Sequence, residues 1–150
     1  MNSSKSMVLP MAIILVFGTL IAIAVRSGFT KSEMKLEFQG DVAAALEQAK
    51  EEDKIVMVDF YADWCGPCRA MEQEAFADDS VAALLENVVL VRVDVDNPGE
   101  NAQLKRDLGV NGIPDVVFLT ADGELIDRIV GYGGIEGFKE EVQAILDKAS

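Results

Sequence analysis

The sequence Cys65-Gly66-Pro67-Cys68 constrains this chain more than any other feature, because it holds both cysteines of the protein. Residues 55–62, which precede it, are almost entirely apolar and predict a buried strand, whereas residues 69–76 after it predict a helix. A thiol pair at this spacing can close into a small disulfide ring and open again. Its position between a strand and a helix is typical of proteins that exchange thiols and disulfides.

The predicted helix gives the two cysteines different expected roles. The reactive species in exchange is the thiolate, and the unpaired N–H groups and dipole of a helix N-terminus favour a negative charge. Cys65 stands at that end, so we expect it to ionise readily and to attack. Cys68, one turn later, is expected to point back toward Cys65 and to resolve a mixed disulfide. Pro67 suits an early helical position, where its missing N–H is no loss.

Two other uses of paired cysteines fit this chain less well. A structural disulfide that closes so short a loop adds little stability. A zinc site needs about four ligands, and the chain has no histidine and no third cysteine. We therefore expect a redox-active disulfide between Cys65 and Cys68, and no metal site.

Three stretches together resemble the thioredoxin family. Residues 58–68 (Val-Asp-Phe-Tyr-Ala-Asp-Trp-Cys-Gly-Pro-Cys) are similar to its active-site strand and loop, residues 110–114 to its cis-proline loop, and residues 123–131 to its closing hairpin. The resemblance covers residues 36–148 and is closest to membrane-linked members, such as the C-terminal domains of bacterial thiol–disulfide interchange proteins. It implies a thioredoxin fold, Cys65 and Cys68 as catalytic residues, and an active-site loop that includes Trp64, Gly66 and Pro67.

Asp59 is the one acidic residue inside the apolar run 55–62. A buried carboxylate costs free energy unless it is paired or protonated. The position matches the family's buried aspartate, so we expect a raised pKa and a catalytic role, in which Asp59 relays a proton for Cys68 through water. The alternative is a strand-end acid that points to solvent. Arg92 stands where thioredoxins carry a lysine near this aspartate.

The resemblance also implies a substrate-binding loop at residues 112–115. The match to Gly112-Ile113-Pro114 predicts a cis peptide bond before the proline, with the backbone of Ile113 free to pair with an extended substrate segment. Asp115 departs from the family, which usually has threonine there. We expect an acid beside the groove to change partner choice, or to hinder thiol ionisation by like-charge repulsion. Trp64 is either a core aromatic or, as the resemblance implies, a cover beside Cys65.

Hydrophobic periodicity and turn signals predict the remaining elements. Strands are expected at 36–38 (a short edge strand), 55–61, 88–95, 116–120 and 125–130; helices are expected at 42–49 after an Asp41 cap, from 65 with a break near 78–80 and a restart through 81–85, at 104–108, and at 135–146. Alternating strands and helices imply parallel crossovers, and the turn at 121–123 implies antiparallel strands. We expect an α/β domain over residues 36–150, with a mixed central sheet flanked by helices on both faces.

Residues 7–25 form an uncharged run of 19 residues, which is nearly long enough to cross a bilayer as a helix. We expect one N-terminal transmembrane anchor, preceded by a tail at 1–6 and followed by a tether at 26–35. The alternative is a signal peptide, since residues 22–24 (Ala-Ile-Ala) resemble a cleavage site. Charges on the two flanks are nearly balanced; the short tail and the resemblance favour an extracytoplasmic, periplasmic domain.

The net charge of −13 argues against a nucleic acid partner, because phosphate binding needs a basic surface. From the family we expect a disulfide reductase, since Gly66-Pro67 resembles the reducing members. Two alternatives stay open: an oxidase or isomerase, and a non-catalytic docking or assembly module. The expected reaction needs no dissociable cofactor. It needs a disulfide-bearing protein substrate and an upstream electron donor, either thioredoxin reductase or a membrane thiol relay, and we expect a monomer.

Overall fold

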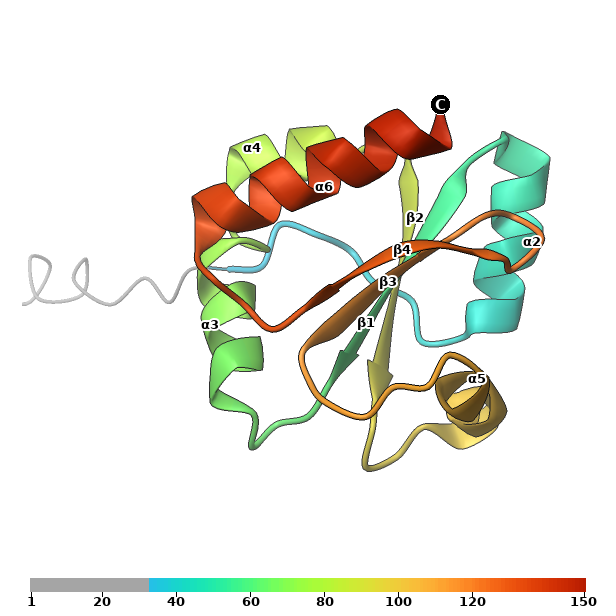
Figure 1. The fold of residues 1–150 in the computed structure, drawn as a ribbon, viewed down its shortest axis with the longest axis horizontal. Coiled ribbons are helices and arrows are strands. Elements are labelled where there is room, and N and C mark those ends of the chain that lie inside the picture. Colours follow the sequence, from blue (N-terminus) through green and yellow to red (C-terminus); the bar gives the residue numbers. More distant parts are fainter. Residues whose placement is uncertain (1–32) are drawn as a thin grey trace, which may run out of the picture. The chain divides into compact units, whose positions relative to one another are not determined.

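The computed structural model describes residues 33–150, which contain a four-stranded mixed sheet in the order β2-β1-β3-β4. The strands are β1 (Ile55–Tyr61), β2 (Val88–Asp94), β3 (Asp115–Leu119) and β4 (Leu125–Val130). β1 pairs in parallel with β2, and the β1–β3 and β3–β4 pairs are antiparallel (Figure 1). The predicted switch from parallel crossovers to a closing hairpin is confirmed.

Helices cover both faces of this sheet. α2 (Val42–Glu52), the short 3₁₀ turn Gly99–Asn101 and α5 (Ala102–Asp107) lie toward one face, whereas α3 (Gly66–Glu74), α4 (Asp79–Leu84) and α6 (Ile135–Ala149) lie against the other (Figure 1). Successive residues of a strand point to opposite faces, so β1 sends Met57 into one hydrophobic cluster and its neighbours Val56 and Val58 into the other. The expected thioredoxin fold, with a mixed sheet between two helical layers, is confirmed.

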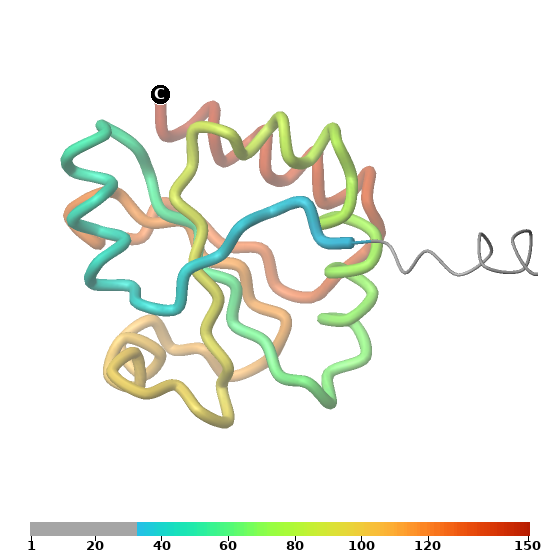
Figure 2. The backbone as a smooth tube through the Cα atoms, turned by 180° about the vertical axis from the view of Figure 1, so that it is seen from behind, coloured from blue at the N-terminus to red at the C-terminus, as the bar shows by residue number. Residues whose placement is uncertain are grey.

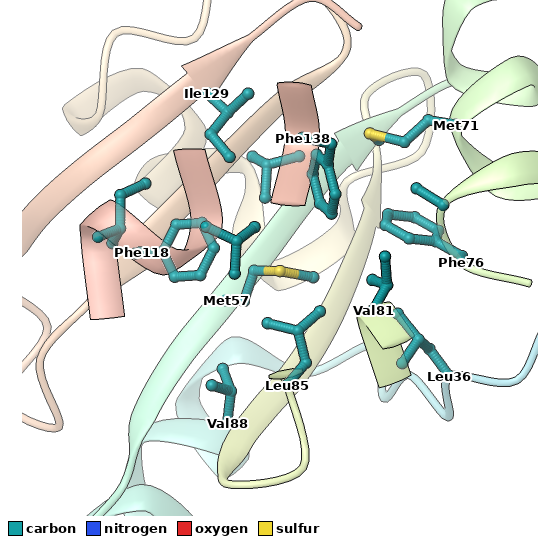
Figure 3. Packing of buried hydrophobic residues seen from close by; sticks show 14 residues of the cluster. Leu36, Met57, Met71, Phe76, Val81, Leu85, Val88, Phe118, Ile129 and Phe138 are labelled. Atoms are coloured by element: carbon teal, nitrogen blue, oxygen red, sulfur yellow. The ribbon is translucent and has the colours of Figure 1, made fainter. Parts of the chain in front are cut away.

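The cluster under α3, α4 and α6 is built around aromatic and sulfur-containing side chains. Phe76 contacts Phe138 with ring centroids 6.0 Å apart, and Met57 and Phe118 rise from the sheet into the same cluster (Figure 3). All four side chains are fully or almost fully buried. This packing seats α3, which carries both cysteines, on the sheet.

Aspartate caps mark two of the helix starts that the sequence predicts. Asp41 accepts hydrogen bonds from the N–H groups of Ala43 and Ala44 at the start of α2. Asp78 does the same for Ser80 and Val81 at the start of α4. Each cap satisfies N–H groups that a helix leaves unpaired. The second cap explains why the helical segment after Cys68 breaks and restarts.

The predicted edge strand at 36–38 is wrong. The segment before α2 runs beside β2 (Figure 2), but its ladder is a single bridge, Gln39 to Val91. The Gln39 N–H donates to Leu90 O at 3.1 Å and the Arg92 N–H donates to Gln39 O at 2.9 Å. Leu36 and Phe38 pack instead against the α3–α4 cluster, so side-chain burial produced the apolar pattern.

Within residues 33–150, no helix has the length and apolar character needed to span a bilayer. The expected tail at 1–6, the membrane segment at 7–25 and most of the tether at 26–35 lie outside the described residues.

Candidate active site

Cys65 and Cys68 form a disulfide at the first turn of α3, just beyond the end of β1. Cys65 is the N-cap residue, and the backbone N–H of Cys68 donates to its Sγ at 3.2 Å. Gly66 and Pro67 occupy the first turn, as the sequence predicts. The same N–H would stabilise a negative charge on the Cys65 sulfur once the disulfide is reduced.

The disulfide lies in a small apolar cluster. Ala62 is buried with both cysteines, and Tyr61, Val95 and Ile113 pack against them. The two cysteines are only 3% and 1% exposed. The disulfide is therefore largely covered, and Cys65 is the slightly more exposed of the two cysteines.

Trp64 directly precedes Cys65 in the chain and is 66% exposed. Its Nε1–H donates to Asp96 Oδ2 at 2.7 Å, which fixes the indole over the loop that follows β2. The core interpretation of Trp64 is therefore wrong, and its role as a cover beside Cys65 remains a prediction.

The peptide bond between Ile113 and Pro114 is cis, as predicted. Gly112 is exposed, Ile113 is half-buried against the cysteines, and Pro114 is buried with its carbonyl accepting the Gly131 N–H at 2.8 Å. The sequence-predicted loop thus lies directly beside the disulfide. That it binds substrate stays a prediction.

The side chain of Asp115 does not behave as expected. It is 2% exposed and forms an ion pair with Arg128, whose Nη1 lies 3.3 Å from Asp115 Oδ2. Burial raises the pKa of Asp115, and the Arg128 charge opposes that rise. A free acid lining the groove is therefore not what the structure contains, because β3 turns this side chain inward.

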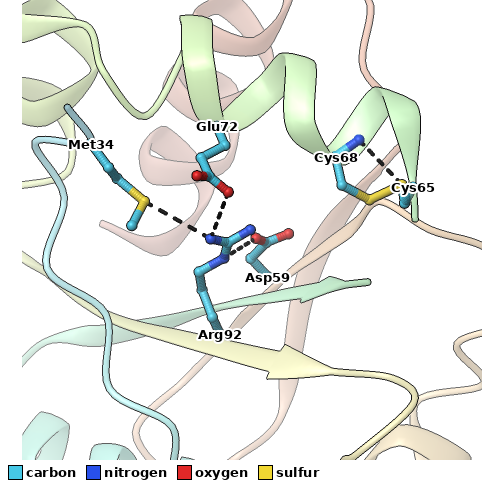
Figure 4. Close-up of polar contacts among 6 residues, drawn as sticks. All are labelled: Met34, Asp59, Cys65, Cys68, Glu72 and Arg92. Carbon is cyan, nitrogen blue, oxygen red and sulfur yellow. Dashed lines mark hydrogen bonds and ion pairs between the residues drawn. A yellow bond between two sulfur atoms is a disulfide. The ribbon is translucent and has the colours of Figure 1, made fainter. Parts of the chain in front are cut away.

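Asp59 is fully buried, so the solvent-facing alternative is wrong. Its Oδ2 accepts a hydrogen bond from Arg92 Nε at 2.9 Å. Figure 4 shows the carboxyl projecting from β1 toward α3, with Arg92 on one side and the disulfide on the other. Its second oxygen, Oδ1, is buried and has no hydrogen-bond partner among residues 33–150. That oxygen is free to accept a proton.

Burial raises the pKa of Asp59 to about 6, against the lowering effects of the Arg92 charge and hydrogen bond. The expected rise in pKa is confirmed. Arg92 itself is held firmly: Nη1 lies 3.1 Å from Glu72 Oε2, and the guanidinium carbon lies 3.9 Å from the Tyr61 ring centroid. Arg92 thus lies beside Asp59; that it stands in for the family's lysine stays a prediction.

Three further residues complete the site, and the sequence reasoning missed them. Glu72 lies four residues after Cys68, so helical spacing could have placed it on the same face. Arg128 lies within the predicted strand 125–130, and its pairing with Asp115 across the hairpin carried no signal in the sequence. Nothing in the sequence marks Asp96 as the partner of Trp64.

Comparison with known proteins agrees with this geometry. The family model described as thioredoxin-like matches residues 37–121. The thiol:disulfide interchange protein DsbD of Yersinia enterocolitica is 41% identical over 103 residues, which cover 67% of this chain and 18% of the relative. DsbD of Ralstonia nicotianae is 38% identical over 112 residues, covering 73% and 18%. The chain thus spans about a fifth of the length of the curated relatives it matches.

Solved structures give the same result. A thioredoxin from Thermus thermophilus superposes with a TM-score of 0.67 at 30% identity, covering 77% of this chain and 90% of that one. The oxidised C-terminal domain of Neisseria meningitidis DsbD gives a TM-score of 0.58 at 28% identity, covering 72% and 98%. The chain therefore belongs to the thioredoxin-like family, and its described domain is similar to the C-terminal domain of DsbD.

Proposed function

We propose that this protein is a thiol–disulfide oxidoreductase that reduces disulfides of protein substrates. The observation that carries the proposal is the Cys65–Cys68 disulfide at the N-terminus of α3, beside the cis-proline loop. A disulfide over so short a loop stabilises little, whereas a thiolate at a helix N-terminus is activated for exchange.

Reduction of a substrate takes two exchange steps. The Cys65 thiolate attacks one substrate sulfur, forms a mixed disulfide and expels the other substrate sulfur as a thiolate. The Cys68 thiolate then attacks the Cys65 sulfur and releases the second substrate thiolate. Two electrons pass to the substrate, both released thiolates take up protons, and the protein is left with the Cys65–Cys68 disulfide.

Asp59 is the group that takes the proton from Cys68 before the second step. An effective general base has a pKa near the working pH, and the pKa of about 6 for Asp59 leaves most of the carboxyl ionised at pH 7. The unpartnered Oδ1 offers the accepting atom. A water molecule would bridge the two groups.

Similarity to known proteins supports the direction and setting that we propose for the reaction. The name of the DsbD relatives describes thiol–disulfide interchange, and the Gly66-Pro67 dipeptide resembles that of reducing members. We infer that an upstream dithiol, from thioredoxin reductase or a membrane thiol relay, reduces the protein again. We also infer that residues 7–25 anchor a monomer in the membrane, with residues 36–150 on the periplasmic side.

A single-turnover transfer tests this function. The full chain is reduced, freed of reductant and mixed with excess insulin at pH 7; we expect two new thiols on insulin per chain. In Asp59→Asn the transfer should be slower by about tenfold or more, because the base is lost while the side-chain shape is kept. The wild-type transfer rate should rise as the pH passes through about 6, where Asp59 loses its proton. The transfer rate of Asp59→Asn should show no such rise.

The Glu74→Gln variant is the matched control, because Glu74 lies on α3 and accepts a hydrogen bond from Tyr132, away from Asp59. Its transfer rate should equal that of the wild type. A wild-type chain that delivers no thiols to insulin contradicts the reductase proposal. An Asp59→Asn rate equal to the wild-type rate removes the proton relay alone.

A further inference from the structure

Arg128 joins the two ends of the loop that carries the cis peptide bond. Its Nη2 donates to the carbonyl of Leu108 at 2.6 Å, and its Nη1 lies 3.3 Å from Asp115 Oδ2. Leu108 caps the C-terminus of α5, and Asp115 opens β3. One guanidinium group from β4 therefore spans residues 108–115.

Apart from the packing of Val110 and Ile113 against the hydrophobic clusters, few hydrogen bonds hold this loop in place. Gly109 adopts a positive φ of 64°, and it and Val110 donate N–H bonds back into α5. Asn111 bonds only to the Gly109 carbonyl among the contacts of the described chain. At the other end, the Pro114 carbonyl accepts the Gly131 N–H. Between these points, the backbone of Gly112 and Ile113 depends on its two ends.

Burying the Arg128–Asp115 ion pair costs desolvation free energy, so the pair is expected to add little net stability to the fold. Asp115 is almost completely buried, and its Oδ1 has no hydrogen-bond partner in residues 33–150. A buried ion pair often contributes no more stability than apolar side chains of the same volume, and its best-supported benefit is to specify one geometry. The geometry that this pair specifies is the separation of the loop ends.

The position of the loop matters because Ile113 packs directly against Cys65 and Cys68. An extended polypeptide that presents a disulfide to Cys65 would lie along this backbone. Main-chain pairing of that kind gives affinity only when the receiving strand is already in place. A small disulfide without a peptide backbone would not use it.

We propose that Arg128 and Asp115 are positioning residues that hold the cis-proline loop as a docking strand for polypeptide substrates, and so set affinity for protein disulfides without taking part in sulfur exchange. The proposal rests on the proposed function, which it deepens by assigning substrate affinity to a pair outside the exchange chemistry.

The test compares a protein disulfide with a small one. In Arg128→Lys the charge remains, but a single ammonium cannot bridge both loop ends as the planar guanidinium does. With the reduced full chain in single turnover, the half-saturating concentration of insulin should rise about tenfold. The rate with 5,5′-dithiobis(2-nitrobenzoic acid) should stay within about twofold of the wild type. Asp115→Asn should also raise the half-saturating concentration of insulin.

Arg106→Lys is the matched control, because Arg106 lies on α5 but its side chain bonds only to Gln103 among the described residues. Hydrogen exchange supplies a readout independent of catalysis. The amides of residues 109–113 should exchange faster in Arg128→Lys than in the wild type, and at the wild-type rate in Arg106→Lys. If Arg128→Lys does not fold, Asp115→Asn decides by the same two measurements.

The proposal is overturned if Arg128→Lys weakens the reaction with insulin and with the small disulfide equally, or changes neither. Unchanged exchange in the loop also overturns it. A wild-type chain that reduces neither disulfide contradicts the proposed function, and the docking role fails with it. The exchange data would then still decide whether Arg128 holds the loop.

Discussion

Replacing Cys68 with serine is expected to stop turnover and to leave the protein covalently joined to its substrate. Cys65 keeps its place at the helix N-terminus, where the N–H of residue 68 points to its sulfur. It can still attack, but no second thiolate remains to release the product. A reduced Cys68→Ser chain mixed with insulin should therefore give one mixed disulfide per chain, seen by mass spectrometry under non-reducing conditions.

Cys65→Ser is the matched control, since it removes one sulfur from the same turn. It should form no mixed disulfide at pH 7, and its turnover should fall by about three orders of magnitude or more, as expected for loss of a nucleophile. Both variants should fold, because the lost disulfide closes only a short loop. Equal trapping by both variants would contradict the assignment of Cys65 as the attacking residue.

Replacing Arg92 with methionine is expected to destabilise the domain strongly and in a pH-dependent way. Arg92 is the hydrogen-bond partner of the fully buried Asp59, and removing one partner of a buried pair costs about 3–5 kcal/mol. We expect a loss of that size in the free energy of unfolding at pH 8, measured by urea titration of the oxidised chain.

The pH dependence follows from the direction of the Asp59 pKa shift. The folded-state pKa of about 6 lies above the usual 3.8, so the native state binds the proton more tightly than the unfolded state. The contribution of Asp59 to the free energy of unfolding is therefore greatest below about pH 4 and is lost as the pH rises through about 6. Without Arg92 the pKa of Asp59 rises further, because Arg92 supplies both lowering effects. The loss in Arg92→Met should therefore shrink at pH 5, where the carboxyl is protonated.

Two variants separate this electrostatic effect from lost packing. In the double variant Asp59→Asn with Arg92→Met, no charge remains to be buried, and most of the loss at pH 8 should disappear. Arg69→Met, in which an exposed arginine loses a bond to the Asp63 carbonyl, should stay within about 0.5 kcal/mol of the wild type. A loss of equal size at pH 5 and pH 8 would show that Arg92 acts through packing alone.

Much of the fold could be predicted because local and global signals agree. The continuous apolar run at 55–61 has the composition of a strand buried on both faces, and it forms β1. Asp41 could be assigned as a cap because aspartate at a helix start has a specific physical role, whereas residues 78–80 were predicted only as a helix break and the structure shows Asp78 as its cap. The edge strand predicted at 36–38 is wrong because an apolar pattern indicates which side chains are buried and does not indicate how the backbone is hydrogen-bonded.

Residue patterns alone predicted the site only where its residues are close in sequence, and the family resemblance added the cis-proline loop and Arg92. Cys65 and Cys68 belong to one turn, and Asp59 lies on the strand that leads into it. The contacts that set its electrostatics join distant segments: Asp59 to Arg92 and Asp115 to Arg128. The second pair depends on the register of β3 against β4, which turns Asp115 away from the groove. One sequence does not specify that register.

The reduction potential of the Cys65–Cys68 pair in the full chain, equilibrated against a series of glutathione mixtures, tests the proposed reductase directly. A reductase of the thioredoxin kind should have a potential near about −270 mV, so that it passes electrons to substrate disulfides and needs a supply of its own. A potential near about −120 mV, typical of a dedicated oxidant, would mean that the pair takes electrons from its partners and would contradict the direction proposed here.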